Sequence, residues 1–305
     1  MKFELKLFRK RGLTIGLFAT ALVSGCFAPL SHSQQVTTAA DELSARSRQQ
    51  DNILKADIPY ANDGWRAENL AQSPRRHEMV KLESRQAFVV YPTTTDKVPV
   101  VVMMPEDQGL NNWSKEMADA IAAMGAIAIV PDWLSGRGPN GGGRESFPDV
   151  KSALMANYAI TQEMSTADQN AWADWGLKLP QSNGKLASLG FGWGAGRAFW
   201  FATQRKDLSA AFIFYDWAPP ESALAGLTAP VYGFYAAKDT RVEKTIENTK
   251  AIMARLGKKY EAVDYPGSEH MFVRLGEMAA DNNPANLYAR NDSLARLQKL
   301  LDGLK

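Results

Sequence analysis

Short apolar runs alternate with amphipathic stretches from about residue 87 to the C-terminus. The runs are rich in β-branched and aromatic residues, which predicts strands. The predicted strands span residues 87–91, 98–104, 126–130, 185–191, 210–215, 229–236 and 259–265. Helical spacing predicts helices over residues 113–124, 195–204, 242–256 and 294–304, with further helical stretches up to residue 175. This alternation predicts an α/β fold with a mostly parallel central sheet and helices on both faces.

Residues 1–25 have the pattern of a signal peptide. A basic segment precedes an apolar run over residues 13–23, which is too short to span a bilayer. The run leads into Val-Ser-Gly-Cys, which resembles the lipobox of bacterial lipoproteins, and Cys26 would be acylated there. Ordinary secretory cleavage after Ser33 is the alternative. Either route predicts an exported protein, periplasmic or lipid-anchored at the bacterial outer membrane.

The rest of the chain is predicted to comprise a polar tether over residues 26–72 and one domain over residues 73–305. A glycine-rich stretch over residues 137–144 is predicted to be a surface loop. The formal net charge of +2 includes +4 from residues 1–25, so the mature chain is slightly acidic. Nucleic acid is therefore not an expected partner, and contact with a membrane is expected only through the lipid anchor at Cys26.

Three ionisable side chains, Glu106, Asp239 and His270, each follow closely after a predicted strand. In parallel α/β sheets, ligands bind outside the carboxyl ends of the strands. The three side chains are therefore expected at one edge of the sheet. Asp239 would be the orienting acid and His270 the general base of a hydrolytic site.

The chain reads Gly-Phe-Gly-Trp-Gly over residues 190–194, between a predicted strand and a predicted helix. Two glycines around a central residue form the framework of a nucleophile elbow, in which the strand turns sharply and presents the central side chain. The backbone N–H of the next residue, Trp193, is the predicted oxyanion donor. The chain order of elbow, acid and histidine also fits positions 192, 239 and 270.

From about residue 73 onward the chain resembles the dienelactone hydrolases (carboxymethylenebutenolidase-like), particularly their exported branch. The matching stretches are Ser73-Pro74-Arg75-Arg76-His77, Pro105-Glu106-Asp107-Gln108-Gly109-Leu110-Asn111, Pro139-Asn140-Gly141-Gly142-Gly143, Asn183-Gly184-Lys185, Gly190-Phe191-Gly192-Trp193-Gly194, Gly233-Phe234-Tyr235 and Tyr265-Pro266-Gly267. The resemblance implies an α/β-hydrolase fold and a small-molecule ester, lactone or carboxylate as ligand. No cofactor is expected, and no metal, because neither clustered metal-ligand spacing nor a phosphate-loop lysine appears in the sequence.

The resemblance also implies roles for single residues. The family's nucleophile is a cysteine at the elbow, helped by a glutamate that matches Glu106. Its acid and base match Asp239 and His270. Two arginines hold the substrate's carboxylate. One falls on Arg274, and Arg137 is the nearest candidate for the other.

The elbow departs from the family pattern because its central residue is Gly192. Glycine has neither a thiol nor a hydroxyl, so an acyl-enzyme has no attacking atom. The neighbouring Ser188 lies inside the predicted strand. Three hypotheses follow: a protein that binds a small, carboxylate-bearing ligand, a residual hydrolase in which His270 or Glu106 activates water, and an envelope lipoprotein with a vestigial pocket.

Several of these residues also have simpler interpretations. Asp239 could cap the helix that begins near residue 242, Glu106 could be a solvated loop acid, and Arg274 could lie on the surface. A minor alternative function is dinucleotide binding. Gly190, Gly192 and Ala195 satisfy that fingerprint after a strand and before a helix, and Asp216 ends the next strand. Against it, the turn follows several strand–helix units rather than opening the fold.

Overall fold

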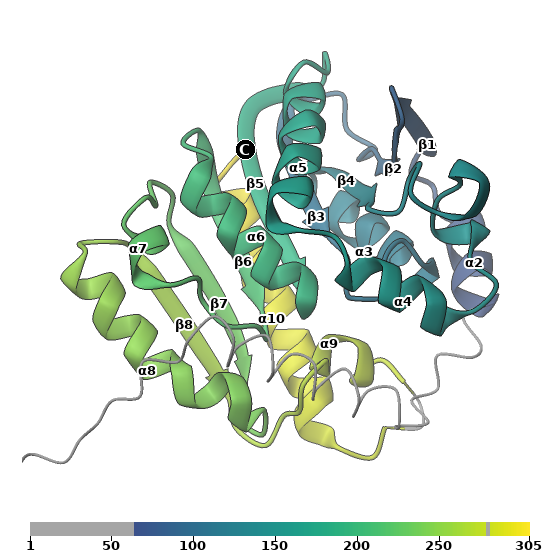
Figure 1. Cartoon of the computed structure of the whole chain (residues 1–305). Helices are drawn as coiled ribbons and strands as arrows, with labels where there is room; N and C mark the ends of the chain where they lie inside the picture. Colours follow the sequence, from purple (N-terminus) through teal and green to yellow (C-terminus); the bar gives the residue numbers. More distant parts are fainter. Residues whose placement is uncertain (1–63, 279–280) are drawn as a thin grey trace, which may run out of the picture. The chain divides into compact units, whose positions relative to one another are not determined.

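The computed structural model describes residues 64–278 and 281–305 (Figure 1). The predicted signal peptide, Cys26 and most of the predicted tether lie outside these residues. Among the helices that are described, none is long and apolar enough to cross a membrane.

A sheet of eight strands runs through the centre of the molecule, in the order β1-β2-β4-β3-β5-β6-β7-β8. The strands are β1 His77–Leu82, β2 Arg85–Val90, β3 Val98–Met104, β4 Ile127–Asp132, β5 Ser182–Phe191, β6 Leu208–Phe214, β7 Val231–Ala236 and β8 Tyr260–Tyr265. Strand β2 pairs antiparallel with both β1 and β4. All other neighbouring strands are parallel. The predicted mostly parallel sheet is confirmed.

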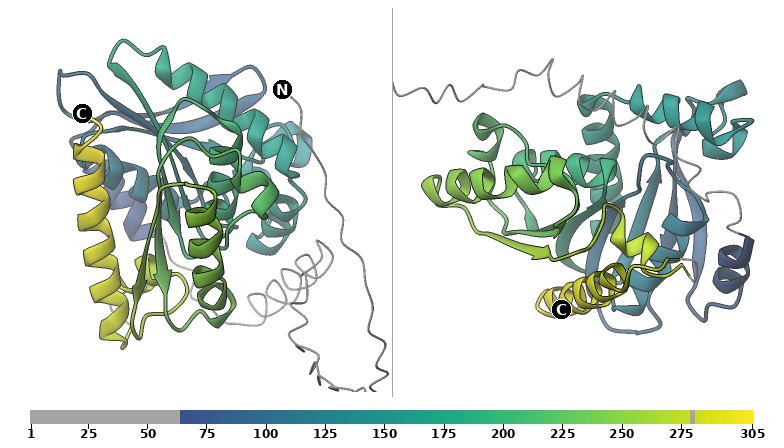
Figure 2. Two further views of the ribbon diagram at one scale, coloured as in Figure 1. Left: turned by 90° about the vertical axis from the view of Figure 1, so that its left-hand side faces the viewer. Right: turned by 90° about the horizontal axis from the view of Figure 1, so that it is seen from below.

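Helices cover both faces of the sheet, as Figures 1 and 2 show. The helices are α2 Gly64–Ala71, α3 Asn112–Ala123, α4 Val150–Tyr158, α5 Gln162–Leu177, α6 Trp193–Gln204, α7 Glu221–Leu224, α8 Thr240–Arg255, α9 Phe272–Leu275 and α10 Pro284–Asp302. One apolar core joins the sheet to α4–α8, and a second joins the opposite face to α2, α3, α9 and α10. The helices on both faces are confirmed.

The central strand β3 shows how the two cores share one strand. All seven of its residues are buried. Val100 and Val102 belong to one core, whereas Val101 and Met103 belong to the other, because successive side chains of a strand point to opposite faces. A strand buried on both faces gives a continuous apolar run, which is why its predicted bounds match the observed ones.

The folded domain begins earlier than the predicted boundary at residue 73, which is therefore too late. Helix α2 packs on α3, and the guanidinium of Arg66 forms ion pairs with Glu116 of α3 and with Glu277. Arg66 is only 3% exposed. The sequence prediction missed α2 because its eight residues carry too few apolar positions to stand out from a polar tether.

Two further elements differ from the sequence prediction. The edge strand β1 was not predicted, since its burial alternates irregularly. Helix α10 begins at Pro284, ten residues before the predicted start, with Asn283 accepting a hydrogen bond from the N–H of Ala285. In addition, the predicted loop over residues 137–144 contains the short 3-10 helix η1 Pro139–Gly141 and the start of η2 Arg144–Ser146.

Candidate hydrolase-type site at the strand ends

The chain turns sharply at Gly192, between β5 and α6. Gly192 has φ 50° and ψ −125°, a conformation that side-chain-bearing residues rarely adopt. Its N–H donates to the carbonyl of Phe214 at the end of β6 (3.0 Å). Trp193 is the first residue of α6, so its N–H has no acceptor within the helix. The backbone therefore has the geometry of a nucleophile elbow, with the predicted oxyanion donor in place.

The three glycines of the elbow have different reasons to be glycine. A Cβ at Gly190 would collide with the backbone of Gly194 and Ala195, and one at Gly194 would collide with the carbonyl of Pro105. These two positions bring strand and helix into close backbone contact. At Gly192, by contrast, a Cβ would lie 3.8 Å from Nε2 of His270 and 3.9 Å from Tyr215. These are ordinary van der Waals distances, so space for a side chain exists at the centre of the elbow.

The predicted acid and base are in direct contact. Nδ1 of His270 lies 2.6 Å from Oδ2 of Asp239, while Nε2 faces Gly192. Asp239 is the N-cap residue of α8 by position, but its side chain makes no capping hydrogen bond. Its carboxylate contacts His270 instead, so the interpretation of Asp239 as a helix cap is wrong.

Arg241 is a third member of this group, and the sequence analysis did not single it out. Its Nε and Nη2 lie 3.1 Å and 2.9 Å from the two oxygens of Asp239, and its guanidinium packs over Trp217. Burial is the largest influence on Asp239 and acts to raise its pKa. The hydrogen bond and charge of His270, followed by those of Arg241, outweigh it and hold the pKa of Asp239 below its usual range. Asp239 therefore stays ionised, and its carboxylate is shared between His270 and Arg241.

The loop that carries His270 is held by the start of α10. The side-chain oxygen of Asn286 accepts from the N–H of Glu269 (2.8 Å), and the amide of Asn283 donates to the carbonyl of Gly267 (3.0 Å). Asn286 is fully buried. The unpredicted first turns of α10 thus position the base. Asn286 is the third residue of α10, and nothing in the sequence around it indicated that it would hold the His270 loop.

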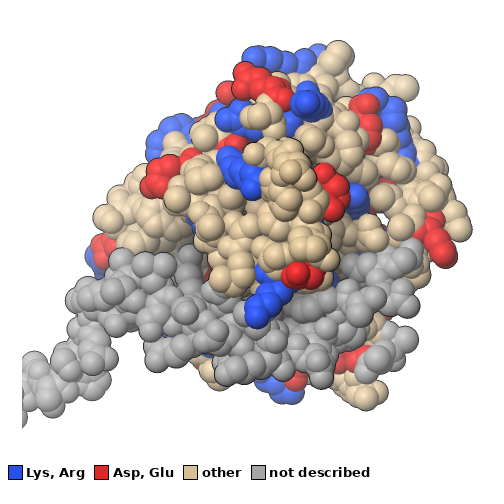
Figure 3. All heavy atoms as spheres, turned by 45° about the vertical axis from the view of Figure 1, so that its right-hand side comes forward, with Lys and Arg blue, Asp and Glu red and all other residues tan. Residues whose placement is uncertain are grey.

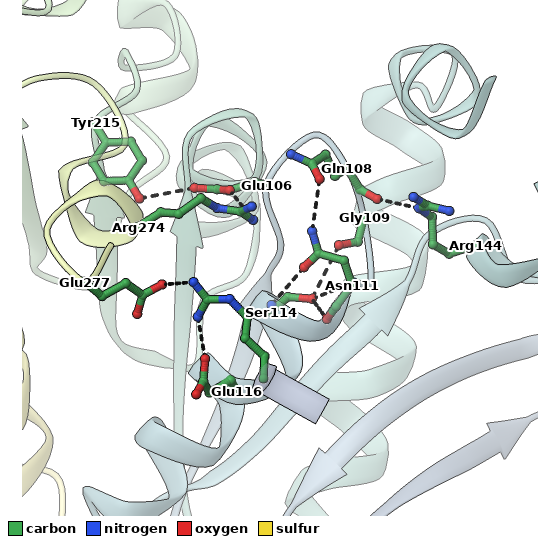
Figure 4. A network of polar contacts seen from close by, with 11 residues as sticks. Glu106, Gln108, Gly109, Asn111, Ser114, Glu116, Arg144, Tyr215, Arg274 and Glu277 are labelled. Atoms are coloured by element: carbon green, nitrogen blue, oxygen red, sulfur yellow. Dashed lines mark hydrogen bonds and ion pairs between the residues drawn. The ribbon is translucent and has the colours of Figure 1, made fainter. Parts of the chain in front are cut away.

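Glu106 lies in the loop 105–111, called the Glu106 loop below, and is only 3% exposed. Figure 4 shows its carboxylate between Arg274 and Tyr215. Nη2 of Arg274 forms an ion pair with Oε2 at 2.9 Å, and the hydroxyl of Tyr215 donates to Oε1 at 3.4 Å. Burial raises the pKa of Glu106, and the charge of Arg274 opposes that shift. Glu106 is thus a buried acid held by Arg274 and Tyr215, and not a solvated loop acid.

Arg274 is buried, at 4% exposure, so the surface interpretation is wrong. It extends from α9 to Glu106 and packs over the ring of Trp113. Arg137 is placed differently. Its Nη1 donates to Asp168 (2.9 Å) and to the carbonyl of Trp133. Within the described residues, its hydrogen bonds and ion pairs do not reach Glu106, His270 or Arg274.

Two other arrangements concern the predicted alternatives. The carboxylate of Asp216 accepts from the N–H groups of Gly196 and Trp217, so it serves the first turn of α6. Ser188 is fully buried within β5, as predicted. No group of three His, Cys, Asp or Glu side chains that could hold a metal occurs in the described part of the chain.

The parallel sheet, the elbow and the Asp239–His270 pair are those of an α/β-hydrolase. The family model "Dienelactone hydrolase family" matches residues 86–303, and the chain belongs to this family. It is 28% identical over 200 residues to a Salmonella typhi protein named "Putative carboxymethylenebutenolidase", covering 61% of this chain and 72% of the relative. It is 26% identical over 208 residues to a Bradyrhizobium protein named "Probable 2-oxo-3-(5-oxofuran-2-ylidene)propanoate lactonase", covering 62% and 79%.

The fold also agrees with that of a solved structure. A dienelactone hydrolase-type protein from Klebsiella pneumoniae superposes with a TM-score of 0.65 at 20% identity, covering 75% of this chain and 98% of that one. At that identity the likeness concerns the fold alone. The α/β-hydrolase fold is thereby confirmed.

Proposed function

We propose that this protein is a dienelactone hydrolase relative that binds a small ligand in the family's pocket without forming a covalent intermediate. One observation carries the proposal. The elbow at residue 192 has its backbone geometry and its base, but no side-chain atom that could attack a carbonyl. The remaining groups, Asp239, His270, Glu106 and Arg274, are assembled around that point.

Arg274 supports a carboxylate as part of the ligand. A guanidinium carries five N–H donors in a planar fork that suits a carboxylate. Glu106 holds the guanidinium in place, so the cation is oriented before a ligand arrives. Since the pair is nearly excluded from solvent, a ligand carboxylate that reaches it would interact with a weakly screened charge.

Ligand-induced stabilisation tests this function. Short carboxylic acids and the corresponding neutral amides would be compared by thermal unfolding of the wild-type protein and of Arg274→Gln. We expect the acids to raise the unfolding temperature of the wild type more than the amides do, since only a ligand bound to the native state stabilises it. No stabilisation by any acid would contradict the proposal and favour a vestigial pocket.

A second candidate function is slow hydrolysis by water, and the orientation of His270 favours it. Its Nε2 faces the space beside Gly192, and Asp239 fixes the ring through Nδ1. A water held there would give a proton to Nε2 as its oxygen attacks the ester carbonyl. The proton would then pass to the leaving oxygen when the acyl C–O bond breaks. Glu106 suits this role less well, because Arg274 and Tyr215 occupy its oxygens.

Turnover of an activated ester distinguishes the two functions. If the protein is a slow hydrolase, its hydrolysis should be abolished in His270→Gln and largely kept in Glu106→Gln. If it only binds ligands, neither the wild type nor these two variants should show turnover above that of the buffer. Measurement of p-nitrophenyl acetate hydrolysis over long times, with matched protein concentrations, gives the comparison.

We also propose that the protein is exported and carries a lipid at Cys26. The support is the sequence alone, a basic segment followed by an apolar run and a lipobox-like sequence. Metabolic labelling with a fatty acid should mark the wild type, and Cys26→Ala should abolish the label. An unlabelled wild type that is free in the periplasm would indicate cleavage after Ser33 instead.

A further inference from the structure

The Glu106 loop brings a second carboxyl into the pocket, that of Asp107. Its Oδ2 accepts a hydrogen bond from the hydroxyl of Tyr158 at 2.7 Å, and its carbonyl accepts from the amide of Asn157 at 2.9 Å. Both partners lie at the end of α4. Asp107 is half-buried, unlike its fully buried neighbour Glu106, so a ligand has access to it.

The aromatic rings place Asp107 beside the elbow. The ring of Tyr158, which holds Asp107, meets the ring of Trp193 edge to face at 6.2 Å. Trp193 directly follows Gly192. The charges of His270 and Arg274 also act on Asp107, although burial is the larger influence and raises its pKa. Asp107 therefore belongs to the same pocket as the elbow, on the side of α4.

The two arginines that contact Asp239 and Glu106 are paired with those carboxylates. Arg274 is paired with Glu106, and Arg241 with Asp239. The only side-chain hydrogen bond that Asp107 has in the described residues comes from the neutral hydroxyl of Tyr158. Arg197 packs over Trp193 at 4.6 Å and Arg144 donates to the carbonyl of Gln108, but Asp107 itself has no ion pair among the described residues. A half-buried carboxylate without a cationic partner is unfavourable until a ligand supplies one.

Gln108, the next residue of the loop, points to a ligand independently. It is 5% exposed. Its amide oxygen accepts from Asn111 at 3.3 Å, but its amide nitrogen has no hydrogen-bond partner among the described residues. Figure 4 shows this nitrogen turned away from Asn111, toward the side of the loop where Glu106 and Arg274 lie. Buried polar groups are almost always satisfied, so an acceptor atom is expected there.

We propose that Asp107 receives an ammonium group of the ligand, so that the pocket takes a small amino acid or an amino-substituted ester or lactone. This rests on the proposed function, in which the ligand's carboxylate or carbonyl end lies toward Arg274. An ammonium group restores the charge balance that Asp107 disturbs, and its carbon neighbours would lie along the rings of Tyr158 and Trp193. A hydroxyl could also donate to Asp107, but it would leave the negative charge uncompensated.

The experiment compares ligands that differ only at one end. The probes are butyrate, 4-hydroxybutyrate and 4-aminobutyrate. Glycine and 6-aminohexanoate are added to vary the distance between the carboxylate and the ammonium group. Each would be titrated at pH 7.5 and constant ionic strength, and the dissociation constants taken from the rise in unfolding temperature. The proteins are the wild type, Asp107→Asn, Tyr158→Phe and the control Asp96→Asn. Asp96 lies in an exposed loop before β3, so the control makes the same chemical change outside the pocket.

We expect at least one amino acid to bind the wild type about tenfold more tightly than the unsubstituted acid, a typical effect of one charge-assisted hydrogen bond. Asp107→Asn should remove this preference, and it should bind butyrate at least as tightly as the wild type does, because a negative charge near the ligand's carboxylate is lost. Tyr158→Phe, which loses only the hydroxyl, should reduce the preference, and it gives an independent test if Asp107→Asn does not fold. Asp96→Asn should behave as the wild type.

The outcomes separate this inference from the function on which it rests. Equal binding of the plain, hydroxy and amino acids overturns the role of Asp107 but keeps the carboxylate site. If Asp107→Asn still binds the amino acids more tightly than butyrate, the role of Asp107 is also overturned. Tighter binding of 4-hydroxybutyrate than of 4-aminobutyrate would overturn it as well. Binding of none of the probes contradicts the proposed function, and the inference with it.

Discussion

Replacement of Gly192 by cysteine would test both the elbow and the pocket. The residue sits at φ 50° and ψ −125°, where a side chain costs about 1–3 kcal/mol of strain. Steric collision adds nothing, because the new Cβ would meet only His270 and Tyr215, at 3.8 Å and 3.9 Å. Gly192→Cys should therefore lower the free energy of unfolding by about 1–3 kcal/mol, or the unfolding temperature by roughly 2–12 °C for a domain of this size.

The same variant should create a reactive thiol. Its sulfur would lie beside Nε2 of His270 and in front of the N–H of Trp193, and a neighbouring histidine lowers the pKa of a cysteine. We expect rapid alkylation by iodoacetamide at neutral pH and hydrolysis of activated esters. The hydrolysis should be lost upon alkylation. Cys26 would be replaced by serine in every protein compared, so that the introduced cysteine carries the only thiol.

Gly184→Cys is the matched control, because Gly184 also has a positive φ, 81°, and a Cβ there meets no described atom within 4 Å. It should show a comparable loss of stability, ordinary thiol reactivity and no ester hydrolysis. Gly192→Ala separates strain from chemistry. A Gly192→Cys protein more stable than the wild type would refute the elbow assignment. A folded variant whose thiol reacts no faster than that of Gly184→Cys would show that His270 does not activate this position.

Three further predictions concern stability. Because the pKa of Asp239 is lowered, its stabilising effect is present above its unfolded pKa of about 4 and is lost as the pH falls through the folded pKa; urea unfolding at pH 3 and pH 6 should show a smaller acid loss in Asp239→Asn than in the wild type. Burial raises the pKa of Asp107, so its contribution becomes unfavourable as the pH rises above about 4. Asp107→Asn should accordingly gain stability relative to the wild type as the pH rises above about 4, and a stability difference that does not change with pH would contradict this. Arg66→Met leaves the partly buried Glu116 without a cation and leaves Glu277 with Arg290 alone, so it should cost about 3 kcal/mol in urea unfolding. Replacement of the exposed Glu68 of the same helix by glutamine should cost well under 1 kcal/mol.

The face shown in Figure 3 gives little further indication of a partner. On the face shown in Figure 3, basic and acidic side chains are interspersed, and no large area of one sign is visible outside the grey atoms. This agrees with the near-neutral charge of the sequence.

Local chemistry allowed the sequence to determine the sheet and the elbow. A strand such as β3 is apolar throughout because both of its faces are buried, and that pattern is visible in a single segment. The glycines of the elbow alternate within five consecutive residues, and Asp239 and His270 each follow closely after a strand. These features, together with the absence of a nucleophile at residue 192, needed no knowledge of distant residues.

Only the tertiary structure decided which groups became partners. The sequence could not tell that Arg274 is buried against Glu106, that Arg137 pairs with Asp168, or that Arg241 shares Asp239 with His270. A charged residue has the same appearance in a sequence whether it is solvated or paired. The Glu106–Arg274 contact joins residues that are far apart along the chain, and Arg66 joins α2 to both α3 and Glu277. Such contacts form because folding buries the charges and each must then find a partner, a requirement that no local pattern records.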